Sequence, residues 1–543
     1  ELALSEVEIE ELTINTSDDS DYYPDIIISM NTFRKLRIKK ISSSFSFHIT
    51  GHWDNKLKKS EITIEEIECK RIRFNELSYK VLKEERKKDK SDNYIKSLGK
   101  LKRIKGTLII KNSALESLGE LEEVDGIDIM EDVSLKDLGK IKSLEALRIS
   151  STDGSTFTNR NDLRYTQGLE KAMSKIDIGT LDISHSTISS LNGIKVRDLV
   201  LTGNQRLESL ENIKVTKSIQ LSHTYIKTVD SEVFNQNLKH IYINDNKSLT
   251  TLDGLGILED ATAVSILRNP GIKTISGIGY VKGGVDINFN ASLEYIGDIK
   301  YGGDIYIENN DSLKEIGHIK EADAIDIRAR NLEKIGDIGL ANSDIRIRRA
   351  GNLQSLGAIG RVDGDVTIKD CYELKTLGGI ESAENVFIDN AFSLQYLGWI
   401  RDVKGLLSIS SNTSLSSVNK YRGLNGMRPV IEYKKGFDIV NFTVGSLILK
   451  NTNVRSVDNV FITNSELDLK FAAEEESAIL SLGSEAFSTC YHKRSEQFID
   501  KRLSLGEVNG GVVELMNNGN LTSVDIRSKF GIQTLSVWEN NSL

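Results

Sequence analysis

Aliphatic residues return along most of this chain with a period of about 20 residues. Between Thr107 and Val418 a segment of the form aliphatic, any residue, aliphatic recurs, as at Val285 and Ile287. A leucine follows each segment in steps of 19 to 21 residues, at Leu293, Leu313, Leu332, Leu353, Leu374, Leu394 and Leu415. A regular period of this length predicts a solenoid in which each repeat forms one coil.

The order of residues within one repeat predicts the parts of a coil. Alternating aliphatics are typical of a short strand with one buried face, which pairs with the same strand of the next coil. The Asn or Asp that often follows favours a sharp turn, because its side chain bonds nearby backbone and tolerates left-handed conformations. An aliphatic residue before Gly, as at Ile296, then marks a second bend. Stacked coils bury these aliphatics in one continuous core.

One clear copy of the repeat reads GGVDINFNASLEYIGDI, from Gly283 to Ile299. This pattern resembles the receptor L-domain branch of leucine-rich repeats, known from receptor tyrosine kinase ectodomains and fungal cell-wall glycoproteins. The resemblance covers residues 97–418 and implies a mainly β, right-handed solenoid with parallel strands, about 20 residues per coil and few short helices. The cysteine-rich modules of animal receptors are absent and the array is longer than one L domain, so the resemblance implies a binding scaffold rather than a receptor.

Three regions are expected. Residues 1–96 form an irregular N-terminal β cap that ends in a helical, charged excursion, and residues 97–418 form the regular solenoid with a polar insertion at 151–175. Residues 419–543 are degenerate repeats with a helical excursion at 470–503. The last six residues, 538–543, resemble the turn and leucine of another coil that ends before it closes, so we expect the native chain to continue beyond Leu543.

Composition and charge argue against several functional classes. The chain has a net charge of −9, whereas most nucleic-acid-binding proteins have an excess of basic residues. The chain contains no run of 18 apolar residues, so the sequence predicts no transmembrane segment. The three cysteines, Cys69, Cys371 and Cys490, are far apart and odd in number, which argues against a disulfide framework, a zinc site or a thioredoxin-like site.

Candidate metal and catalytic residues give no consistent site. His48 and His52 are the only histidines close together in sequence, and the acidic segments at 18–21 and 153–159 do not match a calcium-binding loop. Asp286, Asp304 and Asp326 come closest to a catalytic acid cluster, but Asp304 is out of register with the other two. We therefore predict no catalytic residue, no metal and no cofactor.

The outward residue between the paired aliphatics forms the exposed surface of the strand, which we call the ribbon face. In order it is Ile109, Asp128, Arg148, Asp182, Val200, Gln220, Tyr242, Ser265, Asp286, Tyr306, Asp326, Arg346, Thr367, Phe387 and Ser408. Varied residues on a constant frame are typical of a recognition surface, and equally of a merely solvated face. On the first interpretation Tyr242, Tyr306 and Phe387 are candidate binding residues.

Arginines gather on two successive repeats. Arg328 and Arg330 follow Asp326, and Arg346, Arg348 and Arg349 follow Asp344 one coil later. Stacked coils lie about 4.8 Å apart, so these arginines are expected to form one basic patch. An acidic glycan or a carboxylate-rich protein surface could bind there by bidentate pairing. The favoured alternative is a salt-bridge ladder with Asp304, Glu308, Asp326 and Asp344.

Four Asn-x-Ser/Thr sequons fall on the repeat's own Asn turn, at Asn246, Asn290, Asn310 and Asn412. They are candidate glycosylation sites, and they are compatible with secretion. The turn itself explains them equally well without glycans.

Together these features favour a non-enzymatic cell-surface or extracellular scaffold or adhesion protein. We expect it to bind a protein or an acidic glycan through its ribbon face, or to assemble into a larger structure, without binding nucleic acid. One alternative is an intracellular leucine-rich-repeat sensor or regulator. A more distant alternative is a polysaccharide-active solenoid enzyme.

Overall fold

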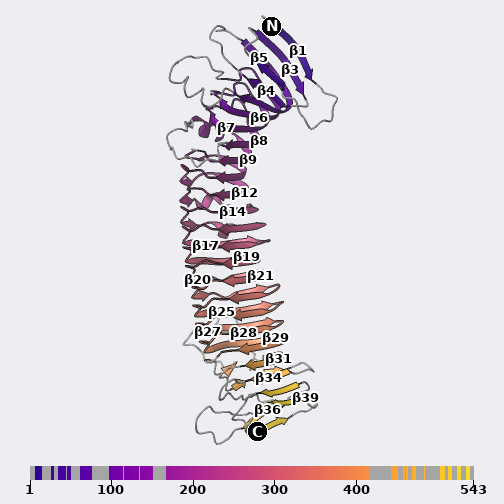
Figure 1. Cartoon of the computed structure of the whole chain (residues 1–543), viewed down its shortest axis with the longest axis vertical. Coiled ribbons are helices and arrows are strands. Elements are labelled where there is room, and N and C mark those ends of the chain that lie inside the picture. Colours follow the sequence, from indigo (N-terminus) through magenta and orange to yellow (C-terminus); the bar gives the residue numbers. More distant parts are fainter. Residues whose placement is uncertain are drawn as a thin grey trace, which may run out of the picture. The chain divides into compact units, whose positions relative to one another are not determined.

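The computed structural model describes backbone and side chains for residues 97–110, 115–130, 135–150, 169–186, 188–409, 411–412 and 414, and elsewhere only the backbone of assigned strand and helix residues. The chain divides into two compact units, Glu1–Gly254 and Leu255–Leu543. Within each unit, parallel strands of successive coils lie one above another (Figure 1). The predicted mainly β, right-handed solenoid with parallel strands and about 20 residues per turn is confirmed.

The described residues of the first unit form strands β1 to β15 and two helical turns. The strands are β1 (Glu6–Ile14), β2 (Ile26–Ser29), β3 (Lys35–Ser43), β4 (Ser46–Thr50), β5 (Glu61–Asn75), β6 (Arg103–Ser113), β7 (Glu123–Val133), β8 (Ser143–Ser150), β9 (Asp177–Ser184), β10 (Lys195–Thr202), β11 (Ser209–Leu210), β12 (Lys214–Ser222), β13 (Thr228–Val229), β14 (His240–Asn244) and β15 (Thr251–Leu252). The helical turns are α2 (Gln167–Met173) and the 3₁₀ turn η2 (Ser231–Val233).

The second unit begins with the 3₁₀ turn η3 (Leu255–Ile257). Its strands up to the end of the fully described region are β16 (Ala263–Leu267), β17 (Thr274–Val281), β18 (Val285–Asn288), β19 (Tyr295–Glu308), β20 (Glu315–Ile316), β21 (Ile319–Arg328), β22 (Lys334–Ile335), β23 (Ile338–Ala341), β24 (Ile345–Arg348), β25 (Ser355–Val362), β26 (Val366–Lys369), β27 (Thr376–Ala383), β28 (Val386–Asp389) and β29 (Tyr396–Ser410). Further strands, described by backbone alone, are β30 (Ser417–Val418), β31 (Phe442–Lys450), β32 (Ser456–Asp458), β33 (Val460–Ile462), β34 (Asp468–Ala472), β35 (Leu482–Gly483), β36 (Arg502–Glu507), β37 (Val512–Met516), β38 (Ser523–Arg527) and β39 (Thr534–Trp538).

The core of the second unit is the aliphatic ladder that the sequence predicts. One register position carries Val285, Ile305, Ile325, Ile345, Val366, Val386 and Leu407 on successive coils. All of these side chains are buried, as are the leucines that mark the repeat from Leu293 to Leu394. Because every coil contributes the same inward positions, the core continues from one coil to the next.

A buried asparagine connects the coils at the corner that follows many of the ribbon strands. Asn310 Nδ2 donates to the carbonyl of Ile287 at 2.7 Å, and its Oδ1 accepts the backbone N–H of Asn290 at 2.9 Å. The same two bonds are made by Asn204, Asn246, Asn290 and Asn412. The predicted Asn turn is therefore also a tie between neighbouring coils.

The residue before the buried corner position is usually left-handed. Asn309 and Arg349 have φ values of 54° and 56°. The coil between them lacks this residue, because Arg328 is followed directly by the buried Ala329. The 19-residue step from Leu313 to Leu332 reflects this shorter corner, and the flanking strands nevertheless stay in register.

Strands β1 to β5 lie within residues 1–96, the region of the expected cap. They already pair in parallel, β1 with β3 and β3 with β5, and β2 with β4 and β4 with β5. Strand β5 in turn pairs with β6, so parallel pairing runs from the cap into the regular coils. The expected excursion at 76–96 lies outside the described residues.

Other irregular regions are described only in part. Helix α2 occupies the end of the predicted insertion 151–175, and residues 151–166 lie outside the described residues. In the segment 470–503, residues 470–472 belong to strand β34, whereas 473–481 and 484–501 are not described. Among the described residues, no helix has the length and apolar character needed to cross a membrane.

Candidate recognition surface on the second unit

The ribbon face of the second unit is one column of outward residues. Asp286 lies beside Tyr306, Tyr306 beside Asp326, and Asp326 beside Arg346 on strands β18, β19, β21 and β24. The column continues through Thr367, Phe387 and Ser408 on β26, β28 and β29. The backbone of these strands is constant, so the face differs from coil to coil only in its side chains.

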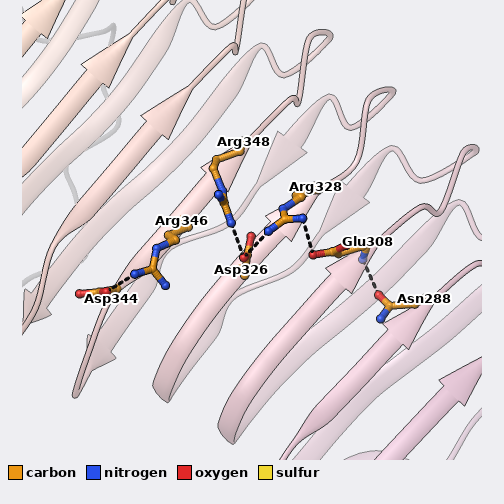
Figure 2. A network of polar contacts seen from close by, with 7 residues as sticks. All are labelled: Asn288, Glu308, Asp326, Arg328, Asp344, Arg346 and Arg348. Carbon is orange, nitrogen blue, oxygen red and sulfur yellow. Dashed lines mark hydrogen bonds and ion pairs between the residues drawn. The ribbon is translucent and has the colours of Figure 1, made fainter.

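A network of charges includes Asp326 and Arg346 of this column and charged residues beside them on the same coils (Figure 2). Asp326 Oδ2 lies 3.0 Å from Arg328 Nη2 and 2.5 Å from Arg348 Nη2, so one carboxylate oxygen holds two arginines. Arg328 Nη1 also lies 3.2 Å from Glu308 Oε1. Arg346 pairs with Asp344 on its own coil. The network, which we call the Asp326 network, therefore spans three successive coils.

An amide continues the Asp326 network to a fourth coil. The side-chain carbonyl of Asn288 accepts the backbone N–H of Glu308 at 2.6 Å (Figure 2). Asn288 Nδ2 donates to the carboxylate of Asp286. Burial, and then the nearby carboxylate of Glu308, raises the pKa of Asp286 above its ordinary value. At this end of the network, the charged form of Asp286 is disfavoured mainly by burial and further by the negative charge of Glu308.

The Asp326 side chain is more deeply buried than the arginine side chains of the network. The Asp326 side chain is 12% exposed, whereas Arg328, Arg348 and Arg346 are 36%, 32% and 46% exposed. The Asp326 carboxylate thus lies close to the sheet, and the guanidinium groups extend toward solvent. Asp326 Oδ1 and Arg348 Nε are buried and have no hydrogen-bond partner among the described residues, so the network does not satisfy all of its own polar atoms.

The pairing of the arginines distinguishes the two interpretations drawn from the sequence. Arg328, Arg346 and Arg348 pair with carboxylates, as in the salt-bridge alternative, rather than forming a bare basic patch. Asp304 is the exception, because it lies beside Ala324 and forms no ion pair with a described residue. This register also confirms that Asp304 does not align with Asp286 and Asp326.

Arg330 and Arg349 do not belong to the Asp326 network. They lie on the turns that follow β21 and β24, and both are exposed. Within the described part of the chain neither side chain forms an ion pair. The two predicted clusters therefore separate into three arginines neutralised by acids and two that keep an unpaired positive charge.

The predicted aromatic binding residues are not brought together. Tyr306 is 43% exposed and lies one coil from Asp326, whereas Phe387 is half-buried and lies three coils from Asp326 in the other direction. Tyr242 belongs to the first unit, where it stacks on His240 with ring centroids 6.2 Å apart. Ile109, predicted to face outward, is only 4% exposed and so lies in the interior rather than on the exposed surface.

The four candidate glycosylation sites are interior residues. Asn246, Asn290, Asn310 and Asn412 are fully buried, and each Nδ2 donates to a backbone carbonyl of a preceding coil. A glycan on any of these nitrogens would replace a bond that ties two coils. We therefore assign these asparagines to coil pairing and do not propose them as glycan carriers.

The candidate metal ligands can be checked only where side chains are described. Among the described residues, no group of three or more His, Cys, Asp or Glu is placed to hold a metal ion. His48, His52 and the acidic segments 18–21 and 153–159 lie outside the residues whose side chains are described. On the first unit, Asp128, Arg148 and Asp182 share one register position, and burial raises the pKa of Asp182.

An aromatic pair at the coil corner was not predicted from the sequence. Tyr372 and Phe392 each lie two residues before the repeat's leucine, and their rings stack with centroids 5.7 Å apart. The signal was an aromatic residue at the same place in two successive repeats. The periodic pattern of the strands does not contain it, because the pair belongs to the turns.

Comparison of the chain with protein-family models, with curated proteins and with solved structures finds no match.

Proposed function

We propose that this chain is a non-enzymatic recognition scaffold that binds a partner rich in carboxylate or sulfate groups through the ribbon face of its second unit. The observation that carries the proposal is the Asp326 network, which holds three arginines in fixed positions on neighbouring coils. The partner is the carboxylate-rich protein surface or acidic glycan expected from the arginine pattern. The resemblance of the repeat to receptor L domains supports the same proposal, because that resemblance implies a binding scaffold.

Pre-pairing makes the arginines better binding groups. A guanidinium offers five N–H donors in a fixed fork, and Arg346 and Arg348 each use one terminal nitrogen on an acid. Both side chains remain partly exposed, so other donors of each guanidinium can reach a partner, although Arg348 Nε is buried. Because the acid already restricts the side chain, less conformational entropy is lost when a partner's oxygens bind.

The balance of positive and negative charges in the Asp326 network determines how strongly we expect it to bind a polyanion. Glu308, Asp326 and Asp344 offset Arg328, Arg346 and Arg348, so the network carries little net charge. Arg330 and Arg349 add unpaired positive charge at its edge. We therefore expect moderate binding that weakens as salt screens it, rather than the strong attraction of a purely basic patch.

The experiment measures binding of the whole chain to immobilised heparin, polygalacturonate and poly-L-glutamate at low and at physiological salt. We expect salt-sensitive binding to at least one of these polyanions. Replacing Arg328, Arg346 and Arg348 together with Gln should weaken that binding at least tenfold, with the fold checked by circular dichroism.

A matched control replaces three other arginines that also pair with acids. Arg103, Arg361 and Arg401 lie away from the outward column and pair with Glu123, Asp363 and Glu381. Their triple Gln variant has the same net charge as the test variant and should bind normally. The proposal fails if no polyanion binds at low salt, or if both triple variants lose binding equally.

We further propose that the scaffold works at a cell surface or outside the cell, alone or assembled into a larger structure. This part rests on the resemblance of the repeat to receptor L domains. The native protein isolated from its source should then have lost a signal sequence, and protease added to intact cells should cleave it. A native protein that keeps its initiator Met and is protected from that protease would contradict this setting.

A further inference from the structure

A column of turn residues lies beside the ribbon face at the corner of the coils. Arg330, Gly351, Tyr372 and Phe392 occupy it on four successive coils, each two residues before the repeat's leucine. Backbone bonds fix the column, because the carbonyls of Arg330, Gly351 and Tyr372 accept from Asn352, Glu373 and Ser393 at 3.1, 3.0 and 3.1 Å. We call this set the corner column.

Two members of the corner column form an exposed aromatic stack. Tyr372 and Phe392 are 46% and 43% exposed, and their ring planes differ by only 10°. Phe392 covers one face of the Tyr372 ring. The other face is directed toward the coil of Gly351, which has no side chain to cover it.

The glycine leaves a slot in the corner column. A Cβ placed on Gly351 would lie 3.6 Å from Tyr372 Cδ2, and, apart from the residues adjacent in the chain, no other described heavy atom would come within 4 Å of it. Arg330 and Tyr372 are two coils apart, roughly 9.6 Å at the usual strand spacing. A flat group placed midway would lie about 4.8 Å from each, within the range for ring stacking and for a cation over a ring.

Unpaired positive charge marks one end of this slot. Arg330 is exposed and forms no ion pair with a described residue, and the same holds for Arg349, two residues before Gly351. On the neighbouring turn, Asp370 is already bonded by Asn390 Nδ2 at 2.8 Å. An occupant that brings a flat ring together with negative charge would therefore complement both features.

We propose that the slot over Gly351 is a docking site for an aromatic side chain of a protein partner, tryptophan above all, flanked by acidic residues. The ring lies between Tyr372 and the Arg330 guanidinium, and its acidic neighbours pair with Arg330 and Arg349. Indole gives the strongest attraction between a cation and a ring, and such anchors commonly dominate protein interfaces. This site is separate from the Asp326 network and does not depend on polyanion binding there.

The test uses random peptides displayed on phage and selected on the whole immobilised chain, with the Gly351→Leu variant for counter-selection. Gly351 does not require a left-handed backbone, so a leucine there should fill the slot without disturbing the coil. We expect the surviving peptides to share a Trp, Tyr or Phe next to Asp or Glu. A synthetic peptide of the enriched sequence is then titrated by fluorescence anisotropy.

Single substitutions should show how much each residue of the slot contributes to peptide affinity. Gly351→Leu and Tyr372→Ala should each weaken the peptide at least tenfold, and Arg330→Gln about threefold, the effect of one exposed cation over a ring. Tyr295→Ala removes another exposed aromatic, 38% exposed on β19, and should change nothing. Replacing the peptide's aromatic residue with Ala should abolish the difference between wild type and Gly351→Leu.

Three results would overturn the proposal. Selection could yield no peptide that distinguishes the wild-type chain from Gly351→Leu, or the distinguishing peptides could lack an aromatic residue. In the third, neutral oligosaccharides bind the wild-type chain but not Gly351→Leu while no aromatic peptide does. The slot would then hold a sugar ring rather than a protein side chain.

Discussion

At the scale of single residues, the corner asparagines carry more structure than their turn position suggests. Asn310 joins the carbonyl of Ile287 to the N–H of Asn290, and its own side chain is fully buried. Removing such a group leaves a buried donor and a buried acceptor without partners, at a cost of about 1–3 kcal/mol each. This explains why a polar residue persists at a position enclosed by aliphatics.

Cys371 takes the asparagine's place on one coil. Its thiol lies 3.5 Å from the carbonyl of Lys369 and 3.9 Å from that of Ile347, and its sulfur accepts the N–H of Ala350. Ile347 and Ala350 are the two partners that an asparagine would bond. Burial raises the pKa of this thiol to about 12, so it stays protonated and acts as a weak donor. The neighbouring corner residues are Ala350 and Ala391, which leave space for a slightly larger group.

We therefore predict that Cys371→Asn folds normally and gains about 1 kcal/mol in free energy of unfolding, because an amide replaces a weak thiol donor. Urea unfolding of the wild type, Cys371→Asn and Cys371→Ala measures the effect. Cys371→Ala serves as the control that removes both bonds. An asparagine variant less stable than the alanine variant would contradict this account of the corner.

A second prediction at the residue scale concerns pH. The raised pKa of Asp286 means that the folded chain holds this proton more tightly than the unfolded chain does. Asp286 therefore adds stability below its ordinary pKa of 3.8, and that stability is lost as pH rises through the folded value. Asp286→Asn keeps an acceptor for Asn288 and removes the charge beside Glu308.

Asp286→Asn should consequently match or exceed the wild type in stability at pH 7. Its advantage should shrink as the pH falls toward 4. Chemical unfolding at a series of pH values measures this difference directly. Asp365→Asn, on another coil, is the control, and an equal pH response in both variants would refute the role assigned to burial and Glu308.

At the scale of elements, periodicity was enough to place the strands and the buried positions. Val285, Ile287 and Leu293 are buried as the alternation and the leucine spacing indicate. Pairing between charged groups could not be predicted, because it depends on which way long side chains turn. Asp326 holding both Arg328 and Arg348 is one example.

The turns were predicted less completely than the strands. The 19-residue step located a short repeat but did not show that the missing residue was the left-handed one before Ala329. The aromatic stack of Tyr372 and Phe392 could have been found, since both residues share one place in the repeat. The open space over Gly351 required the coordinates, because a turn can also need glycine for a left-handed backbone or a close approach of two chains.

Alanine substitutions at two neighbouring glycines test how closely the coils approach each other at a bend. A Cβ on Gly283 would lie 2.2 Å from the carbonyl oxygen of Thr262, whereas one on Gly284 would meet nothing closer than 3.8 Å. Gly283→Ala should therefore force the two coils apart and lower the free energy of unfolding by several kcal/mol. Gly284→Ala should change it by less than about 1 kcal/mol.

Thermal unfolding followed by circular dichroism measures both alanine variants in parallel. Gly284→Ala controls for the loss of glycine flexibility, which the two substitutions share. Equal melting temperatures for the two variants would show that the bend can relax around a methyl group. In that case Gly283 would not be needed for the close approach of the coils.

At the scale of the whole molecule, each unit behaves as a series of nearest neighbours. In the second unit, strand β24 pairs with β21 before it and β26 after it, and other ribbon strands follow the same order. The stability of such an array approximates a sum of coil terms and terms between adjacent coils. Coupling between two positions should therefore decline quickly with the number of coils between them.

Double-mutant cycles on the asparagines measure this range. Asn290 Nδ2 donates to Asn310 Oδ1 at 3.2 Å, so the alanine variants at these two positions remove the same bond and should couple by about 0.5 kcal/mol or more. Asn290→Ala and Asn412→Ala lie several coils apart and should add within about 0.5 kcal/mol. Strong coupling in the distant pair would instead indicate a single cooperative body.

The register shared by the ribbon strands also bears on how such a protein can change over evolutionary time. Each coil presents the same inward positions to the one before and the one after, so duplicating or deleting a complete repeat leaves every remaining pair matched. The surface can then lengthen or shorten by about 4.8 Å per event without any new core. The short corner at Ala329 shows that the repeat length itself tolerates drift, whereas the strand alignment does not change.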